Sequence, residues 1–200
     1  SADKPAPDSY PWVLIGLLWM VSFLNAADRS ILNSVKPLLR DEFGITDVQL
    51  GMVDASFFWI YAVSAFLFGR VGDSVRRRNM IVVGLVFWSL ATGMMPLATG
   101  FAMLLAMRSL VAVGESTYYP TATALISAWH KPAMRSRALS VHQTAVFAGG
   151  GIGGWVAGKL ADSFGWPAPF LLFAAFGFVV FAILFKFLRD DAPEERRAPV

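Results

Sequence analysis

The chain has 200 residues, of which 56% are hydrophobic and 16% are charged, and its formal net charge is +3. Soluble domains carry about 25% charged residues, so this composition indicates a membrane protein. The chain has no cysteine and only two histidines. This excludes disulfides, thiol chemistry and a cysteine-bound metal, and it gives no pattern for a zinc site.

Six apolar stretches follow one another, and each is long enough for a membrane-spanning helix, which needs about 20 mostly apolar residues. They lie at 11–34, 48–69, 79–98, 101–127, 138–160 and 168–188. The connections are short, so we expect consecutive helices to run antiparallel. The sequence therefore predicts an all-α integral membrane domain of six transmembrane helices over 11–188. Polar tails flank it at 1–10 and 189–200, and the second tail is a C-terminal tail or the start of a linker.

The basic residues are divided unevenly between the two sides of this arrangement. Twelve lie in the two tails and in the second and fourth connections, and three lie in the connections of the opposite side. Cytoplasmic segments of membrane proteins carry the excess of Lys and Arg. We therefore expect both termini in the cytoplasm. Since these cations mark one side of a membrane and not one soluble face, we expect no nucleic-acid partner.

Charged residues also occur inside the predicted spans. The first span contains Asp28 and Arg29, and the fourth contains Arg108 and Glu115. A charge at that depth costs at least about 3 kcal/mol, so such residues mark a polar interior with a function. Arg108 and Glu115 are two helical turns apart and share one helix face. A secondary transporter is the first hypothesis, and the structural alternatives are an interhelical pair and a cap on the first span.

The second connection, GRVGDSVRRR (69–78), resembles the cytoplasmic signature G-x-L-[AG]-D-[RK]-x-G-R-[RK] of the major facilitator superfamily. The two agree at Gly69, Asp73, Arg77 and Arg78. Ser74 replaces the usual base, and Arg76 replaces the second glycine. The resemblance implies the N-terminal six-helix half of a twelve-helix fold, completed by a C-terminal half in the same or a separate chain. It also implies that this loop helps to hold the cytoplasmic side closed.

Two further segments resemble two branches of that superfamily, the anion:cation symporters and the spinster-like lysolipid transporters. RSLVAVGE (108–115) resembles R-x-L-x-G-x-G-E, with Ala112 in place of the first glycine, and FLNAADR (23–29) resembles F-x-N-x-x-D-R. The resemblance implies that Asp28 and Glu115 couple transport to protons and that Arg29 and Arg108 face an anionic substrate. The other candidate substrate-binding residues are Asn25, Tyr118, Tyr119 and Gln143.

These motifs favour proton-coupled symport of a small organic anion, a sugar acid or another carboxylate, by alternating access across the inner membrane of a bacterium. One alternative is a spinster-like transporter of lysophospholipids, and another is a non-transporting receptor or assembly half. We expect no enzyme, because Ser116 has no histidine partner at its depth. We expect no cofactor and no metal, with the proton as the coupling ion.

Three other features have simpler interpretations. We expect Asp54 to cap its helix or to pair with Arg29. His142 lies only a few residues from the cytoplasmic end of the fifth predicted span, so we expect it to face interfacial water. The glycine-rich stretch 149–154 is expected to let two helices approach closely.

Overall fold

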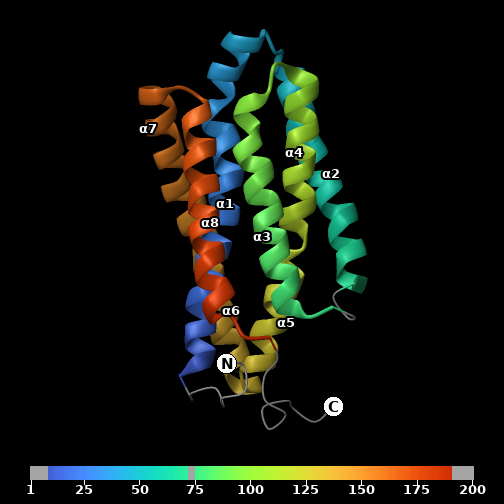
Figure 1. Cartoon of the computed structure of the whole chain (residues 1–200), viewed down its shortest axis with the longest axis vertical. Helices are drawn as coiled ribbons and strands as arrows, with labels where there is room; N and C mark the ends of the chain where they lie inside the picture. The colour runs from blue at the N-terminus through green and yellow to red at the C-terminus, as the bar shows by residue number, and fades with distance from the viewer. Residues whose placement is uncertain (1–8, 72–74, 191–200) are drawn as a thin grey trace.

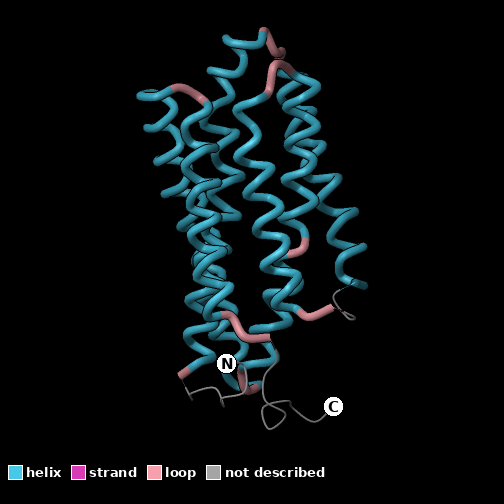
Figure 2. The backbone as a smooth tube through the Cα atoms, viewed as in Figure 1, coloured by secondary structure: helices cyan, strands magenta, loops and turns pink. Residues whose placement is uncertain are grey.

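The computed structural model describes residues 9–71 and 75–190, and Figure 1 shows a bundle of helices that run along one long axis. Within these ranges every regular element is helical, and short loops join the helices (Figure 2). Residues 1–8 and 191–200 of the predicted tails lie outside the described residues, as does Asp73. The helices are α1 (Tyr10–Phe43), α2 (Asp47–Val71), α3 (Arg77–Met94), α4 (Phe101–Ser116), α5 (Tyr118–Trp129), α6 (Pro132–Ala148), α7 (Gly154–Phe164) and α8 (Pro167–Phe187), with a 3-10 turn at Met95–Leu97 and a π-helical turn at Gly149–Gly153.

The six predicted spans correspond to four uninterrupted helices and two interrupted ones. Among the described residues, four helices are long and apolar enough to cross a membrane: Tyr10–Phe43, Asp47–Arg70, Arg77–Leu97 and Pro167–Phe187. They match the first, second, third and sixth predicted spans. In place of the fourth span the chain has α4 and α5, and in place of the fifth it has α6, the π-helical turn and α7.

The break between α4 and α5 has a local cause. Pro120 has no N–H to donate to the carbonyl of Ser116, one turn earlier. The hydroxyls of Ser116 and Thr117 donate to backbone carbonyls three residues earlier, at 2.7 and 2.8 Å. Such side-chain bonds compete with the helical hydrogen bonds and bend helices. The helix of the fourth span is therefore interrupted between α4 and α5.

The first helix extends further than the predicted span. α1 has 34 residues, which is about 51 Å at 1.5 Å per residue and exceeds the thickness of about 30 Å of a bilayer core. It ends where Gly44 adopts a left-handed conformation with φ of 62° and donates its N–H to the carbonyl of Arg40. The expected end at residue 34 was therefore too early. As a result, charged residues of the last turns of α1 stand beside the start of α2, where Arg40 pairs with Asp47.

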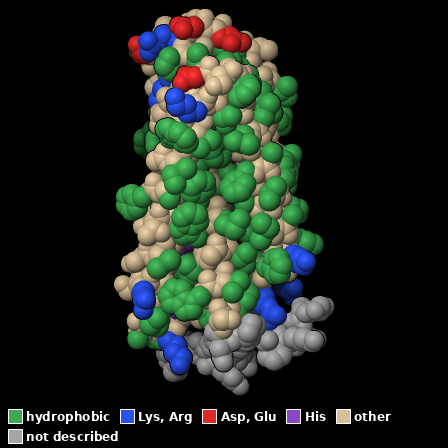
Figure 3. Space-filling view, turned by 90° about the vertical axis from the view of Figure 1, so that its left-hand side faces the viewer, with side chains coloured by type: hydrophobic (Ala, Val, Ile, Leu, Met, Phe, Trp, Pro, Cys, Tyr) green, Lys and Arg blue, Asp and Glu red, His purple; other side chains and the backbone are tan. Residues whose placement is uncertain are grey.

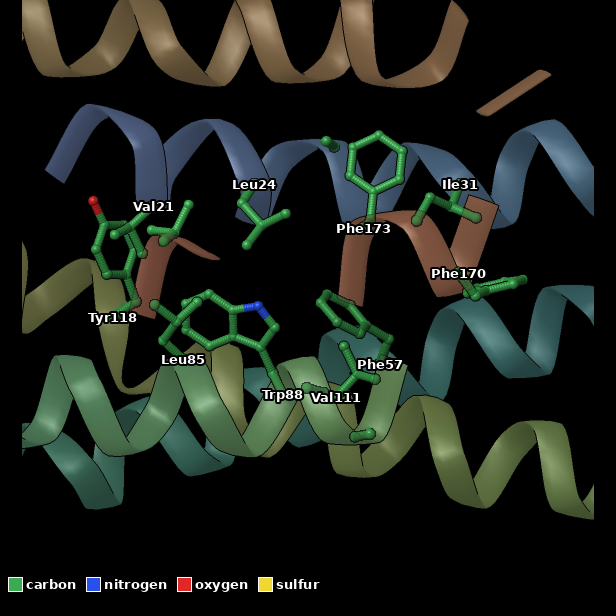
Figure 4. Close-up of a cluster of buried hydrophobic side chains, with 14 of the residues drawn as sticks. Val21, Leu24, Ile31, Phe57, Leu85, Trp88, Val111, Tyr118, Phe170 and Phe173 are labelled. Carbon is green, nitrogen blue, oxygen red and sulfur yellow. The ribbon is translucent and has the colours of Figure 1, made fainter. Parts of the chain in front are cut away.

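α1 lies centrally in the bundle and packs against α6, α7 and α8, while α2 packs on α4 and α3 packs on both α4 and α8 (Figure 1). Between these helices lies one continuous apolar core. In Figure 4, the Trp88 ring lies beside Leu85 and faces Leu24 of α1, with Tyr118 next to Val21 at one end of the cluster. Trp88 and Leu24 are fully buried.

Large apolar side chains also cover the outside of the bundle. Trp59, Phe147 and Phe164 are 74%, 77% and 75% exposed, and Figure 3 shows a wide apolar belt. A surface of this kind is suited to acyl chains and would promote aggregation in water. In the same view, acidic and basic side chains mix at one end, whereas only basic ones are seen among the described residues at the other. The predicted orientation fits this asymmetry and stays a prediction.

The glycine-rich stretch packs against α1, as expected from the sequence. A Cβ at Gly149 would meet the carbonyl oxygen of Phe23, and a Cβ at Gly153 would meet the backbone of Ala27. Backbones approach this closely in membranes only where side chains are small. The contact sets the distance between α1 and the π-helical turn, and so the position of the α1 face that carries Asp28 and Arg29.

Gly153→Leu is expected to destabilise the bundle by about 1–3 kcal/mol or more, because the new side chain has to displace α1. Gly151→Leu is the matched control, since a Cβ at Gly151 meets nothing within 4 Å. Thermal unfolding of both variants in detergent measures the difference. Equal melting temperatures for the two variants would contradict the packing role.

Candidate functional site

Four charged residues of the predicted site come together inside the bundle. Asp28, Arg108 and Glu115 are 2%, 5% and 0% exposed. Arg29 donates from Nε to Oε2 of Glu115 at 3.0 Å and so joins α1 to α4. Asp28 lies within electrostatic range of Arg108 and Glu115. The charged groups therefore face one another and not the surrounding lipid.

One aromatic ring contacts both arginines. The Cζ atoms of Arg29 and Arg108 lie 5.1 Å and 4.2 Å from the centre of the Phe57 ring, and Arg29 also lies 4.7 Å from the ring centre of Tyr61. Cation–π contacts hold both guanidinium groups without neutralising them. Phe57 and Tyr61 are one turn apart on α2, and this spacing is the sequence signal that could have placed them at the site.

The ion pair of Asp54 differs from the expected one. Asp54 pairs with Lys36 at 2.5 Å instead of with Arg29. Lys36 also donates to Oδ1 of Asn33 at 2.8 Å. The expected Asp54–Arg29 pair is wrong because α1 continues as a helix past residue 34, which brings Lys36 opposite α2.

Several buried polar atoms of the site make no hydrogen bond of normal geometry, although Asn25 lies close to Glu115 and Thr92 lies close to Asp28. These atoms are Asn25 Nδ2, Asp28 Oδ1, Arg108 Nε and Glu115 Oε1. Leaving such an atom unpaired costs about 1–3 kcal/mol, so a cluster of them calls for an explanation. The two donors are suited to hold an anion, and the two carboxylate oxygens are suited to take up a proton.

Further polar side chains lie on the exposed side of the bundle next to this cluster. The side chain of Arg29 is 34% exposed, and Asn25 lies one turn before it on α1. The Tyr119 hydroxyl donates to Oε1 of Gln143 at 3.3 Å, and Trp19 Nε1 donates to Oγ1 of Thr144 at 3.0 Å. This polar face (Trp19, Asn25, Arg29, Tyr61, Tyr119, Gln143 and Thr144) is where a substrate could reach the buried charges.

Tyr118 does not lie on the polar face. Its side chain is 1% exposed, and its hydroxyl donates to the carbonyl of Leu18 at 2.5 Å. The single hydroxyl hydrogen is then used, so Nε2 of His142 donates to the same hydroxyl oxygen, at 2.8 Å. The predicted contact of Tyr118 with substrate stays a prediction.

His142 is 1% exposed, so the expectation that it faces interfacial water is wrong. α6 begins at Pro132 and not at residue 138, which places His142 about three turns inside its helix. There it links α6 to α5 and α1 through the Tyr118 hydroxyl.

Tyr118→Phe is expected to lower the free energy of unfolding by about 1–3 kcal/mol, because it leaves buried His142 Nε2 without its partner. Tyr119→Phe removes a hydroxyl from a residue that is 45% exposed and should change stability much less. Unfolding of both variants by denaturant in detergent gives the comparison. A smaller loss for Tyr118→Phe than for Tyr119→Phe would contradict this role.

The described part of the loop motif contacts the end of α8. Gly69 lies near the end of α2, and Arg77 and Arg78 open α3. The backbone N–H of Arg78 donates to Asp190 Oδ1 at 3.0 Å, and its guanidinium donates to the carbonyl of Phe185 at 2.6 Å. Asp190, which sequence reasoning missed, thus caps α3 from a distant part of the chain. The predicted role of the motif in closing the cytoplasmic side stays a prediction.

Residues 18–199 match the sequence model of the Major Facilitator Superfamily. The chain belongs to this superfamily. It is 30% identical over 187 residues to the hexuronate transporter of Bacillus subtilis (strain 168), and 32% identical over 181 residues to protein spinster homolog 1 of Homo sapiens. These alignments cover 94% and 89% of this chain, but 44% and 34% of the relatives, so the chain spans less than half their length.

The fold of this superfamily member is similar to that of a bacterial homolog of the human lysosomal transporter spinster in an inward-facing and occupied conformation. The TM-score is 0.88 at 24% identity, and the match covers 94% of this chain and 46% of the other. This likeness confirms the helical major facilitator fold. The family and the named relatives are transporters and not enzymes, and a second half of similar size is consistent with the lengths.

Proposed function

We propose that this chain forms one half of a secondary active transporter that carries a small organic anion together with protons by alternating access. The observation that carries the proposal is the group of buried Asp28, Arg108 and Glu115 with half-buried Arg29, whose donors and carboxylate oxygens lie beside an exposed polar face. The substrate class follows from the similarity to the hexuronate transporter of Bacillus subtilis, since hexuronates are sugar acids. The proposed location is the inner membrane of a bacterium, with both termini in the cytoplasm.

The arginines are the proposed anion-binding groups. A guanidinium group presents a planar fork of donors that matches a carboxylate, and charge-assisted bonds of this kind are the strong ones. Arg29 reaches the polar face, while Arg108 keeps an unpaired Nε inside. Asn25 Nδ2 is a further donor on the same side.

The Arg29–Glu115 pair supplies a mechanism for coupling. An anion that binds to Arg29 competes with Glu115 for the same guanidinium donor. Glu115 is fully buried, so its carboxylate is then left with less positive charge nearby and binds a proton more readily. Anion and proton thereby favour each other's binding, which is what symport requires. Their joint binding shifts the balance between the inward-open and outward-open states.

A spinster-like transporter of lysophospholipids is the second candidate, favoured by the 32% identity to the human spinster protein. The same arginines would then hold a phosphate, and the substrate would need an apolar site for its tail. The third candidate is a receptor or assembly half that transports nothing. In that case no ligand would be carried across the membrane.

Uptake into proteoliposomes that contain the complete transporter distinguishes the three. We expect a labelled hexuronate to accumulate when the outside is made acidic and to stop accumulating when a protonophore collapses the gradient. Accumulation of a labelled lysophospholipid alone would favour the second candidate, and no flux of either would favour the third. Binding is checked independently by thermal stabilisation, since a ligand at about 100 times its Kd adds about 2.7 kcal/mol.

A further inference from the structure

The neighbour of Asp28 on α3 is a buried threonine, Thr92. The two side chains lie close to each other, and both are 2% exposed. Oγ1 of Thr92 and Oδ1 of Asp28 make no hydrogen bond of normal geometry to any described residue. A buried polar atom without a partner is costly, and most such atoms in folded proteins are paired. This hydroxyl and this carboxyl oxygen are therefore suited to pair with each other.

The packing of α1, α3 and α8 brings Thr92 to this position. Figures 1 and 4 show α1 and α3 running in the same direction along the bundle. A Cβ at Gly177 of α8 would meet the Ser89 hydroxyl and would lie 3.4 Å from Cδ2 of Leu24, so Ser89 and Leu24 meet at this glycine. Thr92 follows Ser89, and Asp28 follows Leu24, by about one helical turn. Thr92 and Asp28 therefore stand at the same level of the bundle.

The hydroxyl of Thr92 is not used within its own helix, unlike comparable hydroxyls of neighbouring helices. Those of Ser109, Thr121 and Thr123 each donate to the backbone carbonyl four residues earlier. Hydroxyl side chains in helices commonly satisfy themselves in this way. Thr92 makes no such bond, so its hydroxyl hydrogen is available to Asp28.

The charged neighbours of Asp28 come from α1 and α4, and they are Arg29, Arg108 and Glu115. α3 has charged residues only at its first two positions and α8 only in its last turn, so neither helix brings a charge to this level. The arginines can only donate hydrogen bonds, whereas a hydroxyl both donates and accepts. The Thr92 hydroxyl is therefore suited to both states of Asp28, the ionised and the protonated one.

We propose that Thr92 is a positioning residue for proton coupling, whose hydroxyl donates to Asp28 after the carboxyl has released its proton and accepts from it while the proton is bound. This inference rests on the proposed function, in which Asp28 carries a coupling proton. An anion that binds to Arg29 and Arg108 offsets their positive charge, but Thr92 stays beside Asp28 on α3. A hydrogen bond to the ionised carboxylate favours release of the proton.

Thr92→Val tests the proposal, because valine has the shape of threonine without the hydroxyl. Proteoliposomes that contain the complete transporter are held at one outside pH, and the initial rate of labelled hexuronate uptake is measured against the inside pH. The inside pH that gives half the maximal rate should rise by about one unit, because Asp28 then keeps its proton up to a higher pH. A purely structural role would lower the rate at every pH and would leave this midpoint unchanged.

Two further variants complete the comparison. Thr92→Ser restores the hydroxyl and should restore the midpoint of the unsubstituted protein. Thr121→Val is the matched control, because it removes a buried hydroxyl that donates to a backbone carbonyl, and it should not move the midpoint. An unmoved midpoint in Thr92→Val would overturn the proposal, as would an equal shift in Thr121→Val. Thermal unfolding in detergent confirms that the variants are folded.

Infrared difference spectra test the contact without transport. The carboxyl C=O stretching band that Asp28→Asn removes belongs to protonated Asp28, and its loss with rising pH gives the midpoint directly. Thr92→Val should change the position of this band and raise its midpoint by about one unit, and Thr92→Ser should restore both. An unchanged band and midpoint would overturn the proposal. If the band responds while the unsubstituted protein takes up no hexuronate, the role of Thr92 at Asp28 is supported and the proposed substrate class is wrong.

Discussion

Asp28→Asn is expected to abolish proton-driven uptake while anion exchange continues. Asp28 is 2% exposed, and its Oδ1 has no hydrogen-bond partner. An amide keeps the shape of the side chain but cannot gain or lose a proton. The transporter without bound anion can then no longer change between its inward-open and outward-open states in a proton-dependent way. Exchange of one anion for another needs no such step. Net uptake should fall at least about tenfold, the change produced by losing 1.4 kcal/mol of coupling.

Labelled hexuronate uptake under an inward proton gradient measures the first effect, and counterflow without a gradient measures the second. Asp54→Asn is the matched control, because Asp54 pairs with Lys36 and not with a residue of the charged cluster. It should leave both measurements close to those of the unsubstituted protein. Full gradient-driven uptake by the Asp28 variant would show that this carboxyl does not carry the coupling proton.

The sequence could predict which charged groups meet. Asp28, Arg29, Arg108 and Glu115 stand in apolar runs, and the cost of exposing a charge to lipid requires them to face one another. The sequence could not predict which of these groups form ion pairs with each other. Arg29 pairs with Glu115 because of how α1 is rotated against α4, and the Phe57 ring of α2 contacts both arginines. Both depend on packing between distant segments, which hydropathy does not encode.

Helix ends were harder to predict than helix centres. A hydropathy window finds the apolar middle of a span, but α1 and α6 both continue through polar residues. Lys36 lies within α1, and Arg135 lies in the first turns of α6. These extra turns explain both errors at single residues, the partner of Asp54 and the burial of His142. The cap of α3 by Asp190 is a contact across 112 residues of sequence, so no local pattern could reveal it.

Arg108→Leu is expected to abolish transport and the thermal stabilisation produced by a hexuronate. Arg108 is 5% exposed, and its Nε is unpaired beside two carboxylates. Removing one partner of a buried charged contact costs about 2–5 kcal/mol in binding, or about 30-fold or more in affinity. Saturation uptake and melting curves with increasing hexuronate measure the two losses.

If Arg108 only stabilised the fold, Arg108→Leu would also abolish transport. Arg108→Lys therefore distinguishes a structural role of Arg108 from anion binding. Lysine keeps the charge opposite Asp28 and Glu115 and should preserve the melting temperature without ligand. It lacks the planar fork, so the KM for the anion should rise about tenfold while transport persists. Arg137→Leu, at an exposed end of α6, should affect neither property. If the hexuronate stabilises the Arg108→Leu variant as strongly as the unsubstituted protein, the anion does not bind at Arg108.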